Sequence, residues 1–129
     1  MKNYRTKLLL LCVALLSLVA WGTTLAQEPP APRPPDNVAG NWTIYTKGDD
    51  GGTSTKYVEL KQEGNDLSGH FKGPDQSGGL EGTVNVHHIV FRTKTRNVFT
   101  FRGMIQGDTM KGTFGIRGHH GEWQAVRSN

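Results

Sequence analysis

The chain has 129 residues, 35% of them hydrophobic, with a formal net charge of +4 and one cysteine. This is the size of a single small domain. Three of the basic residues fall within the first seven positions, which leaves 12 Lys and Arg against 11 Asp and Glu. The remaining charge is close to zero, so it gives no support for nucleic-acid binding.

The first 26 residues have the three-part pattern of a secretory signal peptide. Basic residues precede an apolar run over Leu8–Ala20, and Thr24 and Ala26 are the small residues expected before a cut after Ala26. The run is shorter than the ~20 residues of a membrane-spanning helix. We therefore expect a secreted or periplasmic protein with no stable membrane insertion after cleavage. Cys12 lies within the signal, so the mature chain would contain no disulfide.

Residues 27–37 form the predicted linker. The stretch Glu28–Pro35 is rich in proline, which favours an extended spacer over a helix or an inner strand. The folded domain is then expected over residues 38–129.

Apolar and polar side chains alternate through this domain, and no stretch shows a sustained helical period. The pattern predicts an all-β fold with helix close to absent after the signal. We expect eight strands, at Ala39–Thr46, Thr55–Gln62, Leu67–Lys72, Leu80–Asn85, His88–Thr93, Val98–Ile105, Met110–Arg117 and Glu122–Arg127.

One segment of the chain recurs. Gln62–Phe71 and Ile105–Phe114 share the order Gly, Asn or Asp, apolar residue, Gly and Phe at a constant offset of 43 positions. Each copy reads as a two-residue hairpin with glycine first in the loop, followed by a strand, which is the chemistry of a type II′ turn. The loops are centred on Gly64-Asn65 and Gly107-Asp108.

These loops also predict the strand registers. The first turn places Leu60 opposite Gly69, and the second places Phe101 opposite Phe114. In both hairpins the apolar side chains then share one face, and a slip of one residue would turn them all outward.

A third short turn is expected at Val86-His87, which pairs Val84 with Ile89. Valine disfavours a positive φ. The turn is therefore expected to be either strained or slightly longer than two residues.

Inward-facing glycines suggest a tightly curled sheet; they are Gly69, Gly82, Gly103 and Gly112. With no helix to cover an apolar face, such a sheet is expected to close into an eight-stranded antiparallel up-and-down barrel. Closure would bring Arg127 on the last strand over the ring of Trp42 on the first. We expect this cation–π contact to seal one end as a structural feature.

Gly40-x-Trp42 on the first strand with Arg127 on the last resembles the lipocalin and avidin-like (calycin) barrels. Trp123-x-Ala125-x-Arg127 also resembles the closing strand of avidins. The whole domain is similar to a small barrel module found alone or appended to secreted bacterial hydrolases, with no settled activity. The resemblance implies the barrel fold for nearly all of the mature domain.

Two departures from these families bear on function. Ile44 stands where avidins have an asparagine, and only Trp42 and Trp123 remain after signal removal, which argues against biotin binding. The chain is shorter than lipocalins, which argues against a spacious lipid cavity.

Histidines are the first candidates for metal chemistry. The predicted topology places His87 and His88 at the sealed end and His119 and His120 at the opposite end, and it turns His70 outward. We read them as solvated residues and expect neither a metal nor a cofactor.

Catalytic arrangements are also scarce. The mature chain has no cysteine nucleophile and no Gly-x-Ser-x-Gly elbow. Ser77, Asp75 and His119 would meet at the open end, but such loop residues are commonly turn formers. Asp49 and Asp50 lack the alternating acidic pattern of a calcium loop.

The open end is the expected position of a binding site, because barrel mouths favour pockets. Its loops are predicted at Gly48–Ser54, Gly73–Gly79, Lys94–Asn97 and Gly118–Gly121. The candidate ligand-binding residues are Asp49, Asp50, Asp75, Gln76, Arg96, His119 and His120.

A basic set on the outside of the fifth and sixth strands has two interpretations; its members are Arg92, Lys94, Arg96 and Arg102. It would meet an anionic surface such as a polysaccharide or a lipid headgroup, or it is a solvated face that opposes aggregation.

The leading hypothesis is an exported, non-enzymatic binding module that uses the barrel mouth or its loops for a small molecule, a glycan or a protein partner. The alternatives are a protein-interaction or inhibitor barrel and a small barrel enzyme that uses His119 and His120. Nucleic acid is not an expected partner.

Overall fold

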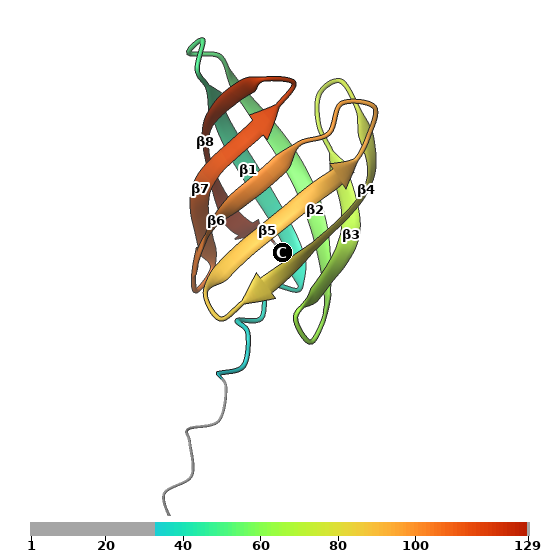
Figure 1. Ribbon diagram of the computed structural model, residues 1–129, viewed down its shortest axis with the longest axis vertical. Coiled ribbons are helices and arrows are strands. Elements are labelled where there is room, and N and C mark those ends of the chain that lie inside the picture. The colour runs from blue at the N-terminus through green and yellow to red at the C-terminus, as the bar shows by residue number, and fades with distance from the viewer. Residues whose placement is uncertain (1–32, 129) are drawn as a thin grey trace, which may run out of the picture. The chain divides into compact units, whose positions relative to one another are not determined.

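The structure, a computed structural model, describes residues 33–128, and these form a closed antiparallel barrel (Figure 1). The strands follow chain order around the barrel: β1 (Gly40–Gly48), β2 (Thr53–Glu63), β3 (Asp66–Lys72), β4 (Ser77–Asn85), β5 (His88–Lys94), β6 (Thr100–Gln106), β7 (Thr109–Ile116) and β8 (His119–Ser128). The predicted fold class is confirmed: all described regular structure is β, in eight strands. Within this range there is no helix long and apolar enough to cross a membrane. The expected signal peptide, residues 1–26, lies outside the described residues.

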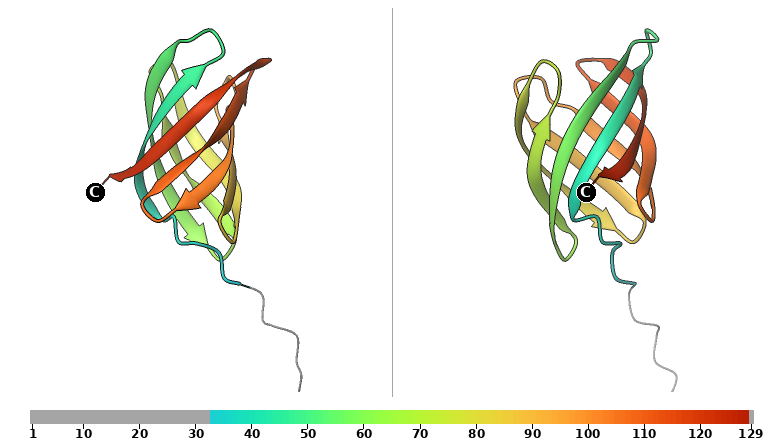
Figure 2. Two further views of the ribbon diagram at one scale, coloured as in Figure 1. Left: turned by 90° about the vertical axis from the view of Figure 1, so that its left-hand side faces the viewer. Right: turned by 180° about the vertical axis from the view of Figure 1, so that it is seen from behind.

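The barrel closes by pairing its first and last strands. β1 is antiparallel to both β2 and β8, and Figure 2 shows β8 running alongside β1. Along β1, Trp42, Ile44 and Thr46 are buried while Tyr45 and Lys47 between and beyond them are exposed. This period of two is what a strand with one face on a core requires.

The predicted registers are also confirmed. Leu60 pairs with Gly69, Phe101 with Phe114, and the third turn pairs Val84 with Ile89. Gly64 and Gly107 have φ of +62° and +60° at the first loop position, as a type II′ turn demands. Val86 occupies the same position of its two-residue turn with φ of +55°, so the strained alternative holds there.

Three open-end connections are shorter or differently placed than predicted. Arg117 and Gly118 both have positive φ, 49° and 79°, and make a two-residue turn of type I′ character. The loop expected over Gly118–Gly121 is therefore wrong, and β8 starts at His119. The loop expected over Gly73–Gly79 ends early, because the Gly73 N–H donates to the Gln76 carbonyl oxygen at 2.9 Å and β4 starts at Ser77.

The start of β6 shifts for another reason. The sequence predicts that this strand begins at Val98, whereas β6 starts at Thr100. The Thr93 hydroxyl accepts the Phe99 N–H at 2.9 Å, and the Thr93 N–H donates to the Phe99 carbonyl at 3.0 Å. The Thr93 hydroxyl thus replaces a backbone carbonyl as the acceptor for the Phe99 N–H, and the segment before Thr100 forms no regular strand.

Aromatic rings run across the interior of the barrel. Phe101 stacks with Phe91 and Phe99 at centroid distances of 4.8 and 5.5 Å, and Trp123 meets it edge-on at 5.6 Å. Phe71 lies 5.6 Å from Phe99. These contacts are within the range of favourable aromatic pairs, and packed side chains, rather than a ligand cavity, occupy the barrel axis.

The base of the barrel is closed by the residues just before β1. Val38 is fully buried, and its carbonyl oxygen accepts the Trp42 indole N–H at 2.9 Å. Gln62 receives the Val38 N–H at 2.8 Å and donates to the Asp36 carbonyl at 2.8 Å. Of the expected linker over residues 27–37, the described part has no strand, and its end is hydrogen-bonded to the barrel.

Arg127 completes this closure. Its guanidinium lies 4.5 Å from the centroid of the Trp42 ring, the contact expected from the sequence. It also donates to the Ala39 and Asn37 carbonyl oxygens at 2.7 and 3.1 Å and pairs with Asp108 at 2.8 Å. One end of the barrel is therefore shut, and a site at a barrel mouth has to lie at the other.

Candidate functional site

The opposite end carries the four connections that follow β1, β3, β5 and β7. In Figure 1 they form two groups, one joining the β1–β2 loop with the β7–β8 turn and the other joining the β3–β4 and β5–β6 loops. Their hydrogen bonds follow the same division. The candidate site is built from these groups and from the inward side chains beneath them.

The first group contains four of the residues predicted as ligand-binding. The Asp49 N–H donates to the His120 carbonyl at 2.8 Å, and its carboxylate lies 3.7 Å from His119 Nδ1. Asp50 accepts the Gly52 N–H at 2.8 Å and so caps its own loop. These side chains are exposed, and a solvated ion pair of this kind contributes about 0–1 kcal/mol. The group joins the end of β1 to the start of β8, and its polar side chains are exposed to water.

The second group contains the other three predicted residues. The Gln76 amide donates to the Asn97 carbonyl at 2.6 Å and accepts the Asn97 N–H at 3.0 Å. This pair of bonds ties the β3–β4 loop to the β5–β6 loop. Asp75 and Arg96, which precede Gln76 and Asn97 in the chain, are exposed. Within residues 33–128 no hydrogen bond or ion pair connects this group with the first, so the seven predicted residues fall into two separate groups at this end.

Lys56 is the feature of this end that sequence reasoning missed. Only 4% of its surface is exposed, although lysine is rarely buried without a charged partner. Its ammonium donates to the Thr46 and Ser54 hydroxyls at 2.9 and 2.8 Å. The ring of Phe99 lies 5.0 Å from the Nζ atom. No carboxylate of the described chain lies within ion-pair distance of it.

Burial lowers the pKa of Lys56 below the ordinary 10.5, and the negative charge of Asp75 opposes the shift. Desolvation penalises the charged form of a buried amine, whereas a nearby carboxylate favours it. Two hydroxyls and an aromatic face offset only part of that cost. Lys56 is a cation whose compensation inside the protein is incomplete.

A separate hydroxyl network lies on β5 and in the loop that follows it. Thr93 is buried, and its hydroxyl lies 2.7 Å from that of Thr95, which donates to the Asn97 carbonyl at 2.8 Å. Because Asn97 is also bonded to Gln76, the network connects the β3–β4 and β5–β6 loops to the buried hydroxyl of Thr93. Phe99, partly buried, lies between the network and the aromatic core.

The alternation of β2 contains the signal for this site. Lys56 precedes Val58 and Leu60 at intervals of two, and these are inward residues. Likewise, Thr46 follows Trp42 and Ile44. Strand parity alone therefore predicts a polar pair at the open end of the interior.

The histidines do not meet. His87 pairs with Asp36 at 2.8 Å at the base, and His119 is on β8 at the open end. In the part of the chain that the structure describes, no three His, Cys, Asp or Glu side chains are placed to hold a metal ion.

No protein-family model matches the chain, and no curated protein matches it. Among solved structures, a redesigned β-barrel is similar, with a TM-score of 0.64 and 14% sequence identity. The match covers 71% of this chain and 92% of that chain. At this identity the likeness shows the fold alone.

Proposed function

We propose that the chain is a non-enzymatic binding module whose open end takes a ligand through an acidic group, with Lys56 as the charge that receives it. The observation that carries the proposal is the buried Lys56 ammonium, held by Thr46 and Ser54 at the unsealed end of the barrel. A carboxylate at this position would supply the compensation that the protein itself leaves incomplete.

Stability considerations support a role in binding. A buried cation without a carboxylate partner costs folding free energy, and apolar residues of similar volume are commonly as stable or more so. Val58 and Leu60 fill the equivalent inward positions of β2 with hydrocarbon. A lysine in this row is therefore better explained by recognition than by packing.

In this proposal a ligand reaches Lys56 past Phe99, whose ring lies 5.0 Å from the Nζ atom. The Gln76–Asn97 bonds hold the two loops over this side of the barrel, and a ligand would replace the Phe99 ring beside Nζ. In this proposal Asp75 and Arg96 flank the entry, and Asp49, Asp50, His119 and His120 form the opposite rim. The ligand is a small acidic molecule or the acidic side chain of a partner protein that inserts into the mouth.

The enzyme alternative has weaker support. His119 is exposed, and its ring nitrogen is 3.7 Å from the Asp49 carboxylate. Export and the calycin-like relationship belong to this proposal too; they are supported by the pattern of residues 1–26 and by the Trp42–Arg127 closure.

A matched ligand set tests the proposal. The purified protein is titrated with carboxylic acids and with the corresponding primary amides while backbone amide resonances are followed by NMR. The acids are expected to shift Thr46, Lys56 and Phe99 and the amides are not, because only a carboxylate compensates the ammonium. Affinity should also fall as pH rises through the lowered pKa of Lys56.

Lys56→Met is the test variant, and Lys61→Met on the exposed face of the same strand is its control. Loss of the acid-specific shifts in the first variant and their retention in the second would support the assignment. Equal binding of acids and amides, or unchanged binding by Lys56→Met, would contradict it. If the protein binds none of the carboxylic acids in the set, the proposed function is contradicted.

A further inference from the structure

A second surface lies outside the barrel, on β5, β6 and β7. Arg92, Arg102 and Lys111 point outward from these strands; together they are called the cationic row. Val90 pairs with Arg102 and Met104 pairs with Lys111, so each basic residue is the diagonal neighbour of the next. Diagonal positions on adjacent strands are ~7–8 Å apart, which gives a regular line of three positive charges.

No member of the row forms an ion pair with another described residue. Among the described residues, Lys94 pairs with Glu81 at 3.3 Å and Arg127 pairs with Asp108, whereas no member of the row has a carboxylate within 4.0 Å. Glu81 lies opposite Arg92 in the register but is engaged by Lys94. Of the basic set predicted from the sequence, Arg92 and Arg102 belong to this row, Lys94 is paired with Glu81, and Arg96 lies in the loop after β5; Lys111 is the third member of the row.

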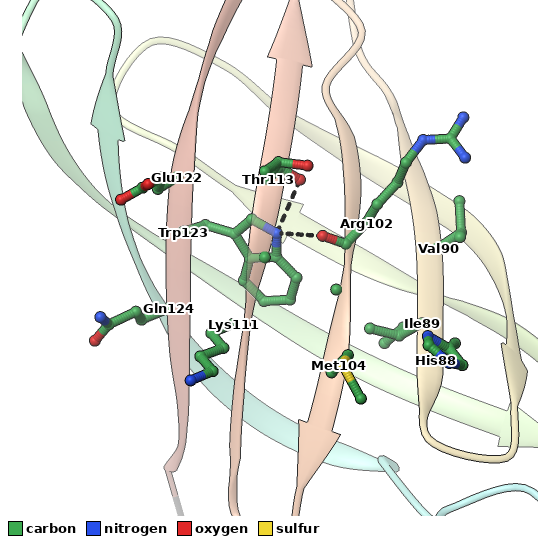
Figure 3. Close-up of a pocket in the computed structure, with 12 residues that line it drawn as sticks. His88, Ile89, Val90, Arg102, Met104, Lys111, Thr113, Glu122, Trp123 and Gln124 are labelled. Carbon is green, nitrogen blue, oxygen red and sulfur yellow. Dashed lines mark hydrogen bonds between the residues drawn. The ribbon is translucent and has the colours of Figure 1, made fainter.

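A groove borders two members of the row, Arg102 and Lys111. Its volume is about 620 Å³, within the range of ligand sites. Arg102, Lys111 and the half-exposed Met104 line it, and Glu122 stands on its far wall (Figure 3). The paired glycines Gly103 and Gly112 contribute backbone to its floor.

Trp123 closes this floor from inside. Its indole N–H is shared between the Arg102 and Thr113 carbonyl oxygens, both at 3.0 Å, as the dashed lines in Figure 3 show. The bond fixes β6 against β7 directly beneath the Arg102 side chain. The groove is thus a rigid surface that is formed before any ligand arrives, which reduces the ordering cost of binding.

We propose that the cationic row and its groove bind an acidic polysaccharide through carboxylate or sulfate groups repeated along the chain. Regular charges on three adjacent strands match a polymer with regular charges, whereas a single anion would use only one of them. Met104 offers an apolar contact to a sugar ring, and Thr113 and Gln124 offer hydrogen bonds to hydroxyls.

Two other polyanions fit this surface less well. Single-stranded nucleic acid is bound by stacking its bases on aromatic side chains, and the exposed tyrosines of the described chain, Tyr45 and Tyr57, are on β1 and β2. A lipid surface would require several exposed apolar side chains, and Met104 is the one large exposed hydrophobic residue that lines this groove. The inference is independent of the Lys56 site, which lies inside the barrel.

The experiment measures binding of polygalacturonate and dextran sulfate, with neutral dextran as the reference polymer, by calorimetry at several salt concentrations. The test variant is Arg92→Gln/Arg102→Gln/Lys111→Gln. The control is Lys47→Gln/Lys61→Gln/Lys72→Gln, which removes the same charge from β1, β2 and β3. All six side chains are exposed, so circular dichroism and the unfolding midpoint should be preserved in both.

The wild type should bind both acidic polymers and not neutral dextran. The affinity of the row variant should fall by at least about tenfold, and that of the control should change by about twofold or less. In the row variant, the slope of the logarithm of the binding constant against the logarithm of salt concentration should decrease by about three. Acid-specific shifts at Thr46 and Lys56 should persist in the row variant, which separates this surface from the proposed function. Equal losses in both variants, no binding of either acidic polymer, or tighter binding to single-stranded DNA or phosphatidylserine vesicles would overturn the inference.

Discussion

Arg127 and Trp42 face each other as register partners on the last and first strands, with the guanidinium 4.5 Å from the ring centroid. The same guanidinium bonds the Ala39 and Asn37 carbonyls and the Asp108 carboxylate. One side chain therefore connects the segment before β1, the β6–β7 turn and β8. This arrangement makes the base the point where both ends of the barrel are held together.

Arg127→Ala should lower the free energy of unfolding by about 2–3 kcal/mol, because it removes a cation–π contact, two hydrogen bonds to backbone carbonyls and the contact with Asp108. Arg127→Lys should have an intermediate effect, since an ammonium cannot reproduce the planar fork. Urea unfolding followed by circular dichroism gives both values. Lys61→Ala, an exposed change on β2, is the control and should stay within about 0.5 kcal/mol. A change that small in Arg127→Ala would show that strand pairing alone closes the barrel.

Val86 has φ of +55° in a turn position that Gly64 and Gly107 fill in the neighbouring hairpins. Such a conformation costs a β-branched residue about 1–3 kcal/mol, more than the 0.5–1 kcal/mol that the extra freedom of glycine typically costs. Val86→Gly should therefore raise the unfolding midpoint in a thermal melt.

The mirror substitution is Gly107→Val, which should lower the midpoint. Its glycine has φ of +60°, and no atom lies within 4 Å of an added Cβ, so the expected loss comes from backbone strain alone. If Val86→Gly lowers the midpoint, packing of the Val86 side chain outweighs the strain.

The regular part of the fold is predictable from the sequence because three features require the same strand register. These are the alternation of apolar and polar residues, the repeat at an offset of 43 positions and the three short turns. Once Gly64 and Gly107 are placed first in two-residue loops, the facing pairs Leu60–Gly69 and Phe101–Phe114 follow. The antiparallel direction of the first and last strands then follows from the even number of strands. These are local constraints that sequence spacing records directly.

The exceptions depend on groups that sequence spacing does not record. Arg117 adopts φ of +49° although it has a side chain, so the glycine after it marked a later turn than the real one. The Thr93 hydroxyl displaces the start of β6, and the two bonds of Gln76 to Asn97 span 21 positions. Lys56 was overlooked for a chemical reason, since lysine is usually read as an outward residue even where the strand parity turns it inward.

Gly103 shows how closely the interior approaches the backbone. A Cβ at this position would lie 2.8 Å from Trp123 Cζ2 and would overlap the Lys111 carbonyl oxygen. Gly103→Ala should therefore destabilise by at least about 1–3 kcal/mol and shift the tryptophan emission, as the indole is forced from its bonds to Arg102 and Thr113.

Gly115→Ala is the matched control on the adjacent strand β7. Its added Cβ would be 3.7 Å from the nearest atom, an ordinary van der Waals contact. It should leave stability within about 0.5 kcal/mol and the emission spectrum unchanged. Similar losses in both variants would mean that strand glycine in general, rather than the Trp123 contact, sets the cost.

The burial of the Lys56 amine makes the free energy of unfolding depend on pH. Burial lowers its pKa in the folded protein below 10.5, with Asp75 acting in the opposite sense. Between the folded and the unfolded pKa, the unfolded chain binds the proton that the folded protein has released. Stability from this group therefore rises with pH across that interval and is constant above 10.5 and below the folded value.

Lys56→Met should abolish this rise and should be as stable as the wild type or more stable at neutral pH, since the desolvated charge is gone. Thermal melts at closely spaced pH values measure the difference between wild type and variant, which cancels the titration of the other lysines and tyrosines. Asp75→Asn should widen the interval, because the carboxylate that favours the ammonium is removed. Lys61→Met, exposed on the same strand, should leave the wild-type profile intact. The prediction is contradicted if the stability difference between the wild type and Lys56→Met does not change with pH. The amine would then be as well solvated in the folded protein as in the unfolded chain. The physical basis for a ligand-receiving charge at the mouth would be lost.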